Sequence, residues 1–175
     1  MAINNQPDNL NLLQTVAFET NFTRIPNSSY FCQRVSIPGM VVGSALQTTS
    51  FSDVPVEGDK ITFDQLNISF LVDEDLQNYQ EIYNWLVSIS FPDNFSQFTS
   101  LKNVPTNTAT DGLSSDVSVI IHTNKANPNY RITFKDVFPI SLGSIDFDAT
   151  VSSLEPIVVE ASFLFTSVFT INKIT

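Results

Sequence analysis

The chain has 175 residues, which is long enough for one domain with a sizeable hydrophobic core. It carries 18 acidic and 8 basic residues, so its formal net charge is −10, and the basic residues are scattered along the chain. Nucleic-acid recognition needs a basic patch and is disfavoured, while a hydrophobic fraction of 42% excludes a disordered chain.

In chain order, a polar, Asn-rich arm precedes one β domain. We place the arm at residues 1–15 and the domain at 16–175. Two strands are predicted at the start of the domain, Val16 to Ile25 and Tyr30 to Ile37, because both segments are rich in β-branched and aromatic residues. The turn-forming residues Pro26 to Ser29 join them.

A projecting hairpin or long loop is predicted next. Pro38 and Gly39 end the preceding strand, and the polar stretch Ser44 to Lys60 alternates only weakly. A long strand then runs from Lys60 to Val72. Its apolar residues change parity near Asp64–Gln65, which predicts a β-bulge at that point.

One amphipathic helix follows this strand. Apolar residues recur at spacings of three and four and predict one buried stripe: Leu76, Tyr79, Ile82, Tyr83, Leu86 and Ile89. The acids Asp73 to Asp75 precede the stripe, and we expect them to cap the helix N-terminus. A calcium loop is disfavoured because no glycine follows at the required position. Trp85 lies off the centre of the stripe, so we expect it at the edge or in an interface.

The second half of the chain is again mainly β. A long polar connection at residues 93–113 leads to four predicted strands: Asp116 to Thr123, Tyr130 to Val137, Ser141 to Asp148 and Ile157 to Ile171. The last strand alternates apolar and polar residues far beyond the usual five or six residues. A strand of this length predicts a sheet that continues into a neighbouring molecule.

No set of residues indicates an active site. The acids of Asp53 to Lys60 are expected at a solvated or intersubunit loop tip, and Asp146 and Asp148 on the polar face of a strand. His122 is the only histidine, and no serine has the context of an activated nucleophile. Cys32, the single cysteine, is expected to be a small buried hydrophobe. We predict a non-enzymatic protein with no metal or cofactor.

Three segments resemble the tail tube proteins of contractile-tailed bacteriophages. They are VSIPGM (Val35 to Met40), GDKITFDQLNISFLVDEDLQNYQEIYNWL (Gly58 to Leu86) and VVEASFLFTSVFTI (Val158 to Ile171). Together with the order of the elements, the resemblance covers most of residues 16–171. It rests on structural patterns and not on a catalytic signature, and the junction between strand and helix at Asp73 to Trp85 carries most of it.

This resemblance implies a mainly β fold, a β-barrel or sandwich with one flanking α-helix. It implies homohexameric rings that stack into a tube, a sheath and a baseplate as partners, and a channel through which viral DNA passes without specific binding. We expect the protein in the virion tail, assembled in the host cytoplasm, with no membrane association, since the sequence shows neither a signal peptide nor a membrane-spanning stretch. Type VI secretion tubes and tube-initiating baseplate proteins share the fold, so a baseplate initiator or tube cap is an alternative, as is an acidic β-sandwich binding module.

Two sets of residues are candidates for function within such a tube. The segment that matches the family's ring-stacking loop contains Ser44, Phe51, Asp53, Glu57 and Asp59. Polar-face acids that could line the channel are Asp64, Asp146, Asp148 and Glu160. Acids in a channel would repel DNA and keep it from adhering.

Overall fold

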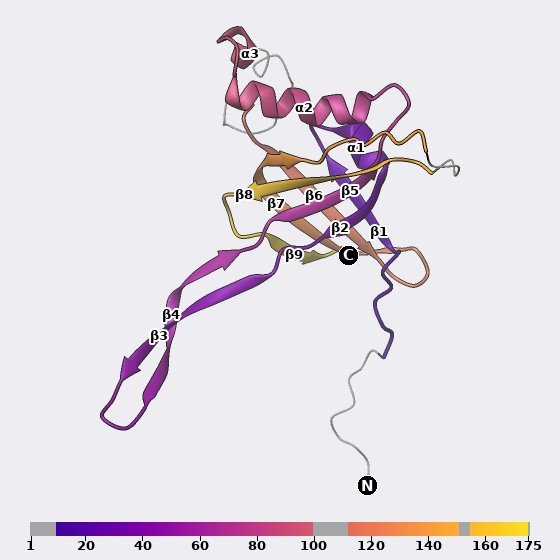
Figure 1. Cartoon of the computed structure of the whole chain (residues 1–175). Coiled ribbons are helices and arrows are strands. Elements are labelled where there is room, and N and C mark those ends of the chain that lie inside the picture. The colour runs from indigo at the N-terminus through magenta and orange to yellow at the C-terminus, as the bar shows by residue number, and fades with distance from the viewer. Residues whose placement is uncertain (1–9, 100–111, 151–154, 175) are drawn as a thin grey trace.

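The body of the protein is a seven-stranded antiparallel sheet, seen in the computed structural model, which describes residues 10–99, 112–150 and 155–174 (Figure 1). In spatial order its strands are β1 (Phe18–Phe22), β6 (Ser115–His122), β7 (Pro128–Leu142), β8 (Val158–Phe165), β5 (Leu66–Leu71) and β2 (Cys32–Ser36), and β9 (Thr170–Lys173) pairs with β7. A second sheet consists of two strands, β3 (Met40–Thr48) and β4 (Asp53–Phe63). The predicted mainly β fold is confirmed.

The core lies between the apolar face of the large sheet and one long helix, α2 (Gln77–Ser90). Alternate residues of the central strands are buried, as the period of two along a strand requires: Leu66, Ile68, Phe70, Val117, Val119, Ile132, Phe134, Val159, Ala161 and Phe163. The Phe163 ring joins the layers, because its centroid is 5.5 Å from that of Phe22 and 6.1 Å from that of Trp85. Figure 1 shows α2 on the side of the sheet opposite the small hairpin.

The start of α2 differs from the prediction. Leu76, the residue before the helix, has a left-handed backbone (φ 56°), and no side chain caps the helix. Asn78 organises this corner instead: its Nδ2 donates to the Leu71 carbonyl at 2.6 Å, and its Oδ1 accepts from the Asp73 and Tyr79 amides at 3.2 and 2.8 Å. The capping role predicted for Asp73 to Asp75 is therefore wrong. The chain turns sharply after β5, and a buried amide can bond both sides of that turn.

The buried face of α2 is also rotated from the predicted stripe. Trp85 is 1% exposed and Ile82 is fully buried, whereas Tyr83 is 53% exposed. Trp85 was expected at the edge and Tyr83 in the stripe, so both predictions are wrong. The spacing rule fixes a stripe but not its centre, and here the largest ring faces the sheet.

The predicted turn at Pro26 to Ser29 is part of a short helix, α1 (Pro26–Tyr30). Proline favours the first helical position, and tertiary hydrogen bonds hold the rest. Ser28 Oγ donates to the Asn78 carbonyl at 2.9 Å, and Ser29 Oγ donates to the Thr20 carbonyl. A third helix, α3 (Ser96–Thr99), lies in the predicted polar connection, the rest of which (residues 100–111) is outside the described residues.

Two predicted long strands are each divided. Lys60 to Val72 forms the end of β4 and all of β5, in different sheets, and the predicted bulge at Asp64–Gln65 is the passage between them. Ile157 to Ile171 forms β8 and part of β9, with a break after Phe165. The 15-residue strand is β7, which merges two predicted strands. A register shift after Pro139 accommodates the proline that suggested a break.

Candidate assembly surfaces

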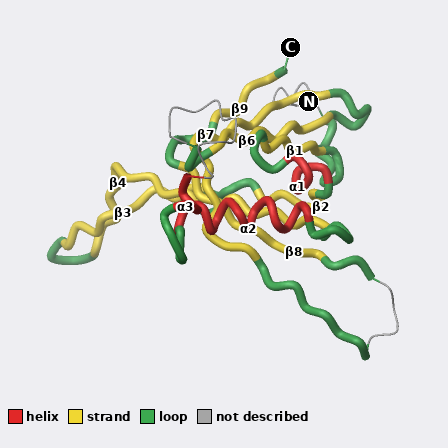
Figure 2. Tube along the Cα trace, turned by 90° about the horizontal axis from the view of Figure 1, so that it is seen from above, coloured by secondary structure: helices red, strands yellow, loops and turns green. Residues whose placement is uncertain are grey.

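The β3–β4 hairpin leaves the body as a separate two-stranded sheet. Figures 1 and 2 show it extending well beyond the large sheet. Every residue of β3 is exposed, and β4 is exposed except near its bulge and its last residue. Within the described residues, β3 and β4 pair only with each other. Both outer edges of the hairpin therefore present unpaired backbone donors and acceptors.

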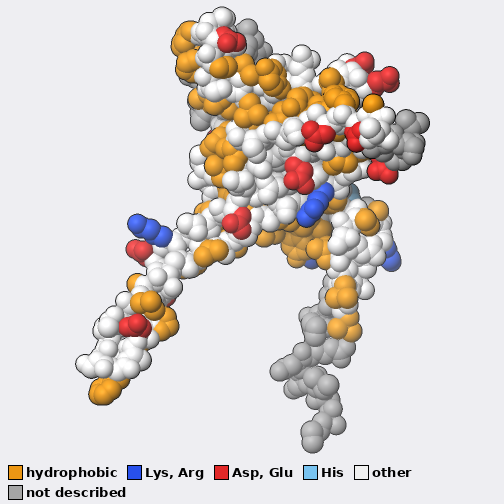
Figure 3. Space-filling model, viewed as in Figure 1, with side chains coloured by type: hydrophobic (Ala, Val, Ile, Leu, Met, Phe, Trp, Pro, Cys, Tyr) orange, Lys and Arg blue, Asp and Glu red, His pale blue; other side chains and the backbone are white. Residues whose placement is uncertain are grey.

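Both faces of this hairpin carry apolar side chains. One face includes Met40, Val42 and Leu46, which are 56%, 58% and 69% exposed. The opposite face includes Val41 and Val54, and the orange side chains in Figure 3 follow the hairpin to its tip. A two-stranded hairpin in water is at best marginally stable. The arrangement is suited to burial against another chain.

Two glycines set the shape of the hairpin at a bulge, where the register shifts after Val42. A Cβ on Gly58 would lie 2.3 Å from the Gly43 carbonyl oxygen, so any side chain there would force the two strands apart. A Cβ on Gly43 would meet nothing closer than 3.8 Å, the Lys60 carbonyl. Only Gly58 is required by the close approach of the backbones.

The joint between hairpin and body is formed by Gly39 and Asp64. The Asp64 amide donates to the Gly39 carbonyl at 3.1 Å. The Asp64 carboxylate lies against the glycine, because a Cβ there would be 2.7 Å from Oδ2. This contact leaves little freedom for the angle at which the hairpin meets the large sheet.

All five ring-stacking candidates lie in this hairpin. Ser44 and Glu57 face each other across it, Asp53 opens β4, and Asp59 lies in the bulged part. Phe51 is at the tip and fully exposed. The segment had been expected as a polar loop, but most of it is paired strand. Its weak alternation results from apolar residues on both faces.

The channel-lining candidates come from three separate places. Glu160 is on β8 and points away from the core, where it accepts a hydrogen bond from Ser69 Oγ at 3.4 Å. Asp64 is at the hairpin joint. Asp146 and Asp148 lie in the exposed segment after β7, so the strand predicted for Ser141 to Asp148 is wrong beyond its first two residues. Gly143 and the following residues leave the sheet as the chain turns towards β8.

Asp148 has a local partner in that segment. Its Oδ1 accepts from the Thr150 hydroxyl at 2.6 Å and from the Thr150 amide at 2.8 Å. These bonds favour the carboxylate and lower the pKa of Asp148. Asp148 therefore stabilises a turn in an exposed segment.

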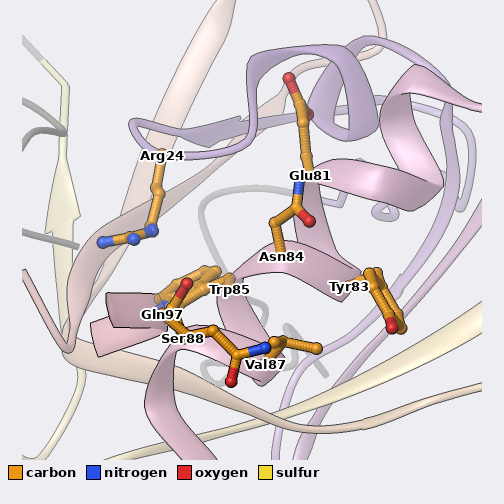
Figure 4. Close-up of a pocket in the computed structure, with 8 residues that line it drawn as sticks. All are labelled: Arg24, Glu81, Tyr83, Asn84, Trp85, Val87, Ser88 and Gln97. Atoms are coloured by element: carbon orange, nitrogen blue, oxygen red, sulfur yellow. The ribbon is translucent and has the colours of Figure 1, made fainter. Parts of the chain in front are cut away.

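A hollow of about 620 Å³ lies along α2 (Figure 4). The Arg24 guanidinium is 4.9 Å from the Trp85 ring and donates to the Gly112 carbonyl, and Trp85 Nε1 donates to the Leu113 carbonyl at 3.0 Å. These contacts attach the chain at residues 112–113 to the helix. Burial lowers the pKa of Arg24. The sequence analysis missed this anchor, and Trp85 as the single tryptophan was the available signal.

The described residues offer no catalytic constellation. Cys32 is half-buried on β2, and burial raises the pKa of its thiol, which is the opposite of nucleophile activation. His122 on β6 lies 3.7 Å from a Glu19 carboxylate oxygen. Among the residues that the structure describes, no group of three or more His, Cys, Asp or Glu side chains could hold a metal ion. Nor does any described helix have the length and apolar character needed to cross a membrane.

A sequence profile of the phage tail tube protein family matches residues 3–167. The chain belongs to this family. This is a structural family, and the resemblance inferred from the three segments is confirmed. No curated protein sequence matches the chain.

Solved structures with the same fold come from tailed injection machines. A chain of the anti-feeding prophage baseplate has a TM-score of 0.57 at 11% identity, over 95% of this chain and 96% of that one. A chain of the anti-feeding prophage tube-terminating cap has 0.56 at 14%, over 99% and 100%. A chain of the sheath–tube complex of the extracellular contractile injection system PVC has 0.53 at 15%, over 93% of both. At these identities the likeness establishes the fold of this tail tube protein.

Proposed function

We propose that this tail tube protein is the repeating subunit of the tube in a contractile phage tail. Six copies form a ring, rings stack into a tube, and viral DNA passes through the central channel without specific binding. A sheath surrounds the tube and a baseplate carries it. The protein is then a virion component assembled in the host cytoplasm. The observation that carries the proposal is the projecting hairpin.

The hairpin requires a neighbour for physical reasons. Its strands expose apolar side chains on both faces, and their outer edges are unpaired within the described residues. Exposed edges of this length promote open-ended aggregation. A head-to-tail interface that closes into a ring satisfies every edge and ends growth at a defined size. Ring formation is therefore the assembly that uses this surface fully.

The large sheet supplies a surface suited to a channel wall. The side of β5 and β8 opposite the core carries Asn67, Ser69, Glu160 and Ser162, small polar or acidic side chains. The whole chain carries a net charge of −10. A wall with hydroxyl, amide and carboxylate groups gives DNA phosphates no cationic contacts. We assign Glu160 to this wall and keep the other three acids as further candidates.

Assembly of the purified protein tests the proposal. Electron microscopy and analytical ultracentrifugation should show particles of six times the 19.5 kDa mass of one chain, with a central channel, and stacks of such rings at high concentration. A monomer at all concentrations would contradict the proposal and favour an acidic β-sandwich binding module.

Channel charge is tested separately. Changing Glu160 and the remaining candidates Asp64, Asp146 and Asp148 to Lys in a phage carrying the gene should leave tubes assembled and slow DNA ejection. Normal ejection through intact mutant tubes would remove the repulsive-channel hypothesis while leaving the tube role in place.

A tube cap or baseplate initiator is the second candidate. It is favoured by the TM-scores of the cap and baseplate chains, which are at least as high as that of the sheath–tube complex. A cap or initiator should form single rings that bind only tube ends. A tube subunit should polymerise or be distributed along the whole tail, so immunogold labelling of tails separates the two roles.

A further inference from the structure

The large sheet is open between its two edge strands, β1 and β2. Each pairs on one side only, β1 with β6 and β2 with β5, and no described backbone hydrogen bond joins them. At the end near α1 the gap is bridged, since the Ser29 hydroxyl and carbonyl bond the carbonyl and hydroxyl of Thr20. The opposite end has no such bridge in the described residues.

A groove of about 410 Å³ occupies that unbridged end. Most of its lining is apolar and comes from the arm, both edge strands and β6: Leu13, Phe18, Val35, Ile37, Val119 and Ile121. Val119 is 1% exposed and belongs to the core, so the groove reaches down to the core between the two edges. The groove therefore combines an apolar floor with strand edges on either side, which is the setting for addition of a strand.

Charge distinguishes what the groove can accept. Arg34 is the only charged residue among the described residues that line it, and no described acid lies within ion-pair distance of its guanidinium. The β3–β4 hairpin carries three acids, Asp53, Glu57 and Asp59, against one lysine. The hairpin and the groove are thus complementary in charge, in apolar character and in unpaired backbone groups.

The hairpin cannot serve its own groove. It starts directly after β2, through Pro38 and the rigid Gly39–Asp64 joint, and Figures 1 and 2 show it directed away from the sheet. The occupant must come from another molecule. We infer that the groove between β1 and β2 receives the β3–β4 hairpin of a second copy of this chain, with Arg34 facing the hairpin acids. This inference rests on the proposed ring assembly and names its acceptor surface.

Cysteine cross-linking tests the contact directly. In a Cys32→Ser background, Gln33→Cys on β2 is combined with Ser44→Cys or Gln47→Cys on the hairpin, and assembled protein is treated with a mild oxidant. At least one pair should give covalent oligomers up to the size of the ring on non-reducing gels. Replacing Gln33→Cys by Ser90→Cys, on an exposed part of α2, should give none.

The results separate the two proposals. Rings without cross-links from either pair would overturn the groove inference and leave the ring proposal intact. Failure of the Cys32→Ser protein to assemble, while natural protein also stays monomeric, would overturn both. Equal cross-linking from the Ser90→Cys control would show random collision and overturn the groove inference.

Charge reversal gives a second readout. Arg34→Glu should weaken ring formation by about fivefold, the scale of one exposed ion pair, in sedimentation at several concentrations. Adding Glu57→Lys should recover most of the loss if the two residues face each other. A double variant weaker than Arg34→Glu alone, with unchanged circular dichroism, would overturn the assignment of Glu57, and unchanged assembly of Arg34→Glu would overturn the role of the arginine.

Discussion

Truncating Trp85 tests the observed orientation of α2. The side chain is 1% exposed, packs on Phe163, lies under Arg24 and donates to the Leu113 carbonyl. Replacing a buried Trp by Ala costs about 3–5 kcal/mol of unfolding free energy, a large part of the about 5–15 kcal/mol that stabilises a typical domain. For a chain of this size the melting temperature should fall by about 6–20 °C.

Trp85→Phe divides this loss into parts. It keeps an aromatic ring against Phe163 but removes the indole donor and leaves the Leu113 carbonyl without it. We expect a loss of about 1–3 kcal/mol, from one hydrogen bond and a partly filled site. Tyr83→Ala, on the same helix but at an exposed position, is the matched control and should cost less than about 1 kcal/mol.

The measurement is urea unfolding followed by far-ultraviolet circular dichroism, because the variants lack the only tryptophan fluorophore. Protein concentration is kept below the assembly threshold, since association adds to apparent stability. If Tyr83→Ala cost as much as Trp85→Ala, the buried face would be the stripe predicted from the sequence, and the packing described for Trp85 would be refuted.

Three further predictions concern the hairpin, the helix start and pH. Gly58→Ala should abolish rings while shifting the melting temperature of the body little, because the new Cβ meets backbone at 2.3 Å, whereas Gly43→Ala should assemble; equal behaviour would refute the close approach. Asn78→Ala should cost about 2–4 kcal/mol by leaving buried backbone groups unpaired, and Asn or Gln substitutions at residues 73–75 almost nothing, as measured by urea unfolding; the reverse order would restore the capping role. Burial raises the pKa of Glu81, so the folded state binds its proton more tightly and the free energy of unfolding should fall as pH rises from about 4 through that raised pKa; Glu81→Gln should flatten this slope, and an unchanged slope would refute it.

The sequence by itself determined the class of the fold and the outline of the assembly. Its composition and the alternation along strands such as Val117 to Ile121 predicted a mainly β protein, because a strand that covers a core on one face must alternate. The three-and-four spacing after Val72 located the one long helix. The stretch Ser44 to Lys60 was recognised as a projection because its weak alternation and turn residues fit no buried strand.

Tertiary structure decided what each local signal left open. Helical spacing could not choose between Tyr83 and Trp85 for the buried centre, since that depends on where the helix meets Phe163. Asn78 bonds the Leu71 carbonyl across the corner that joins β5 to α2, and no capping rule based on adjacent acids can anticipate that bond. The groove between β1 and β2 exists only because strands distant in the chain form the sheet between them. Local sequence sets which face of an element is apolar, but the partner that covers that face is set by long-range packing.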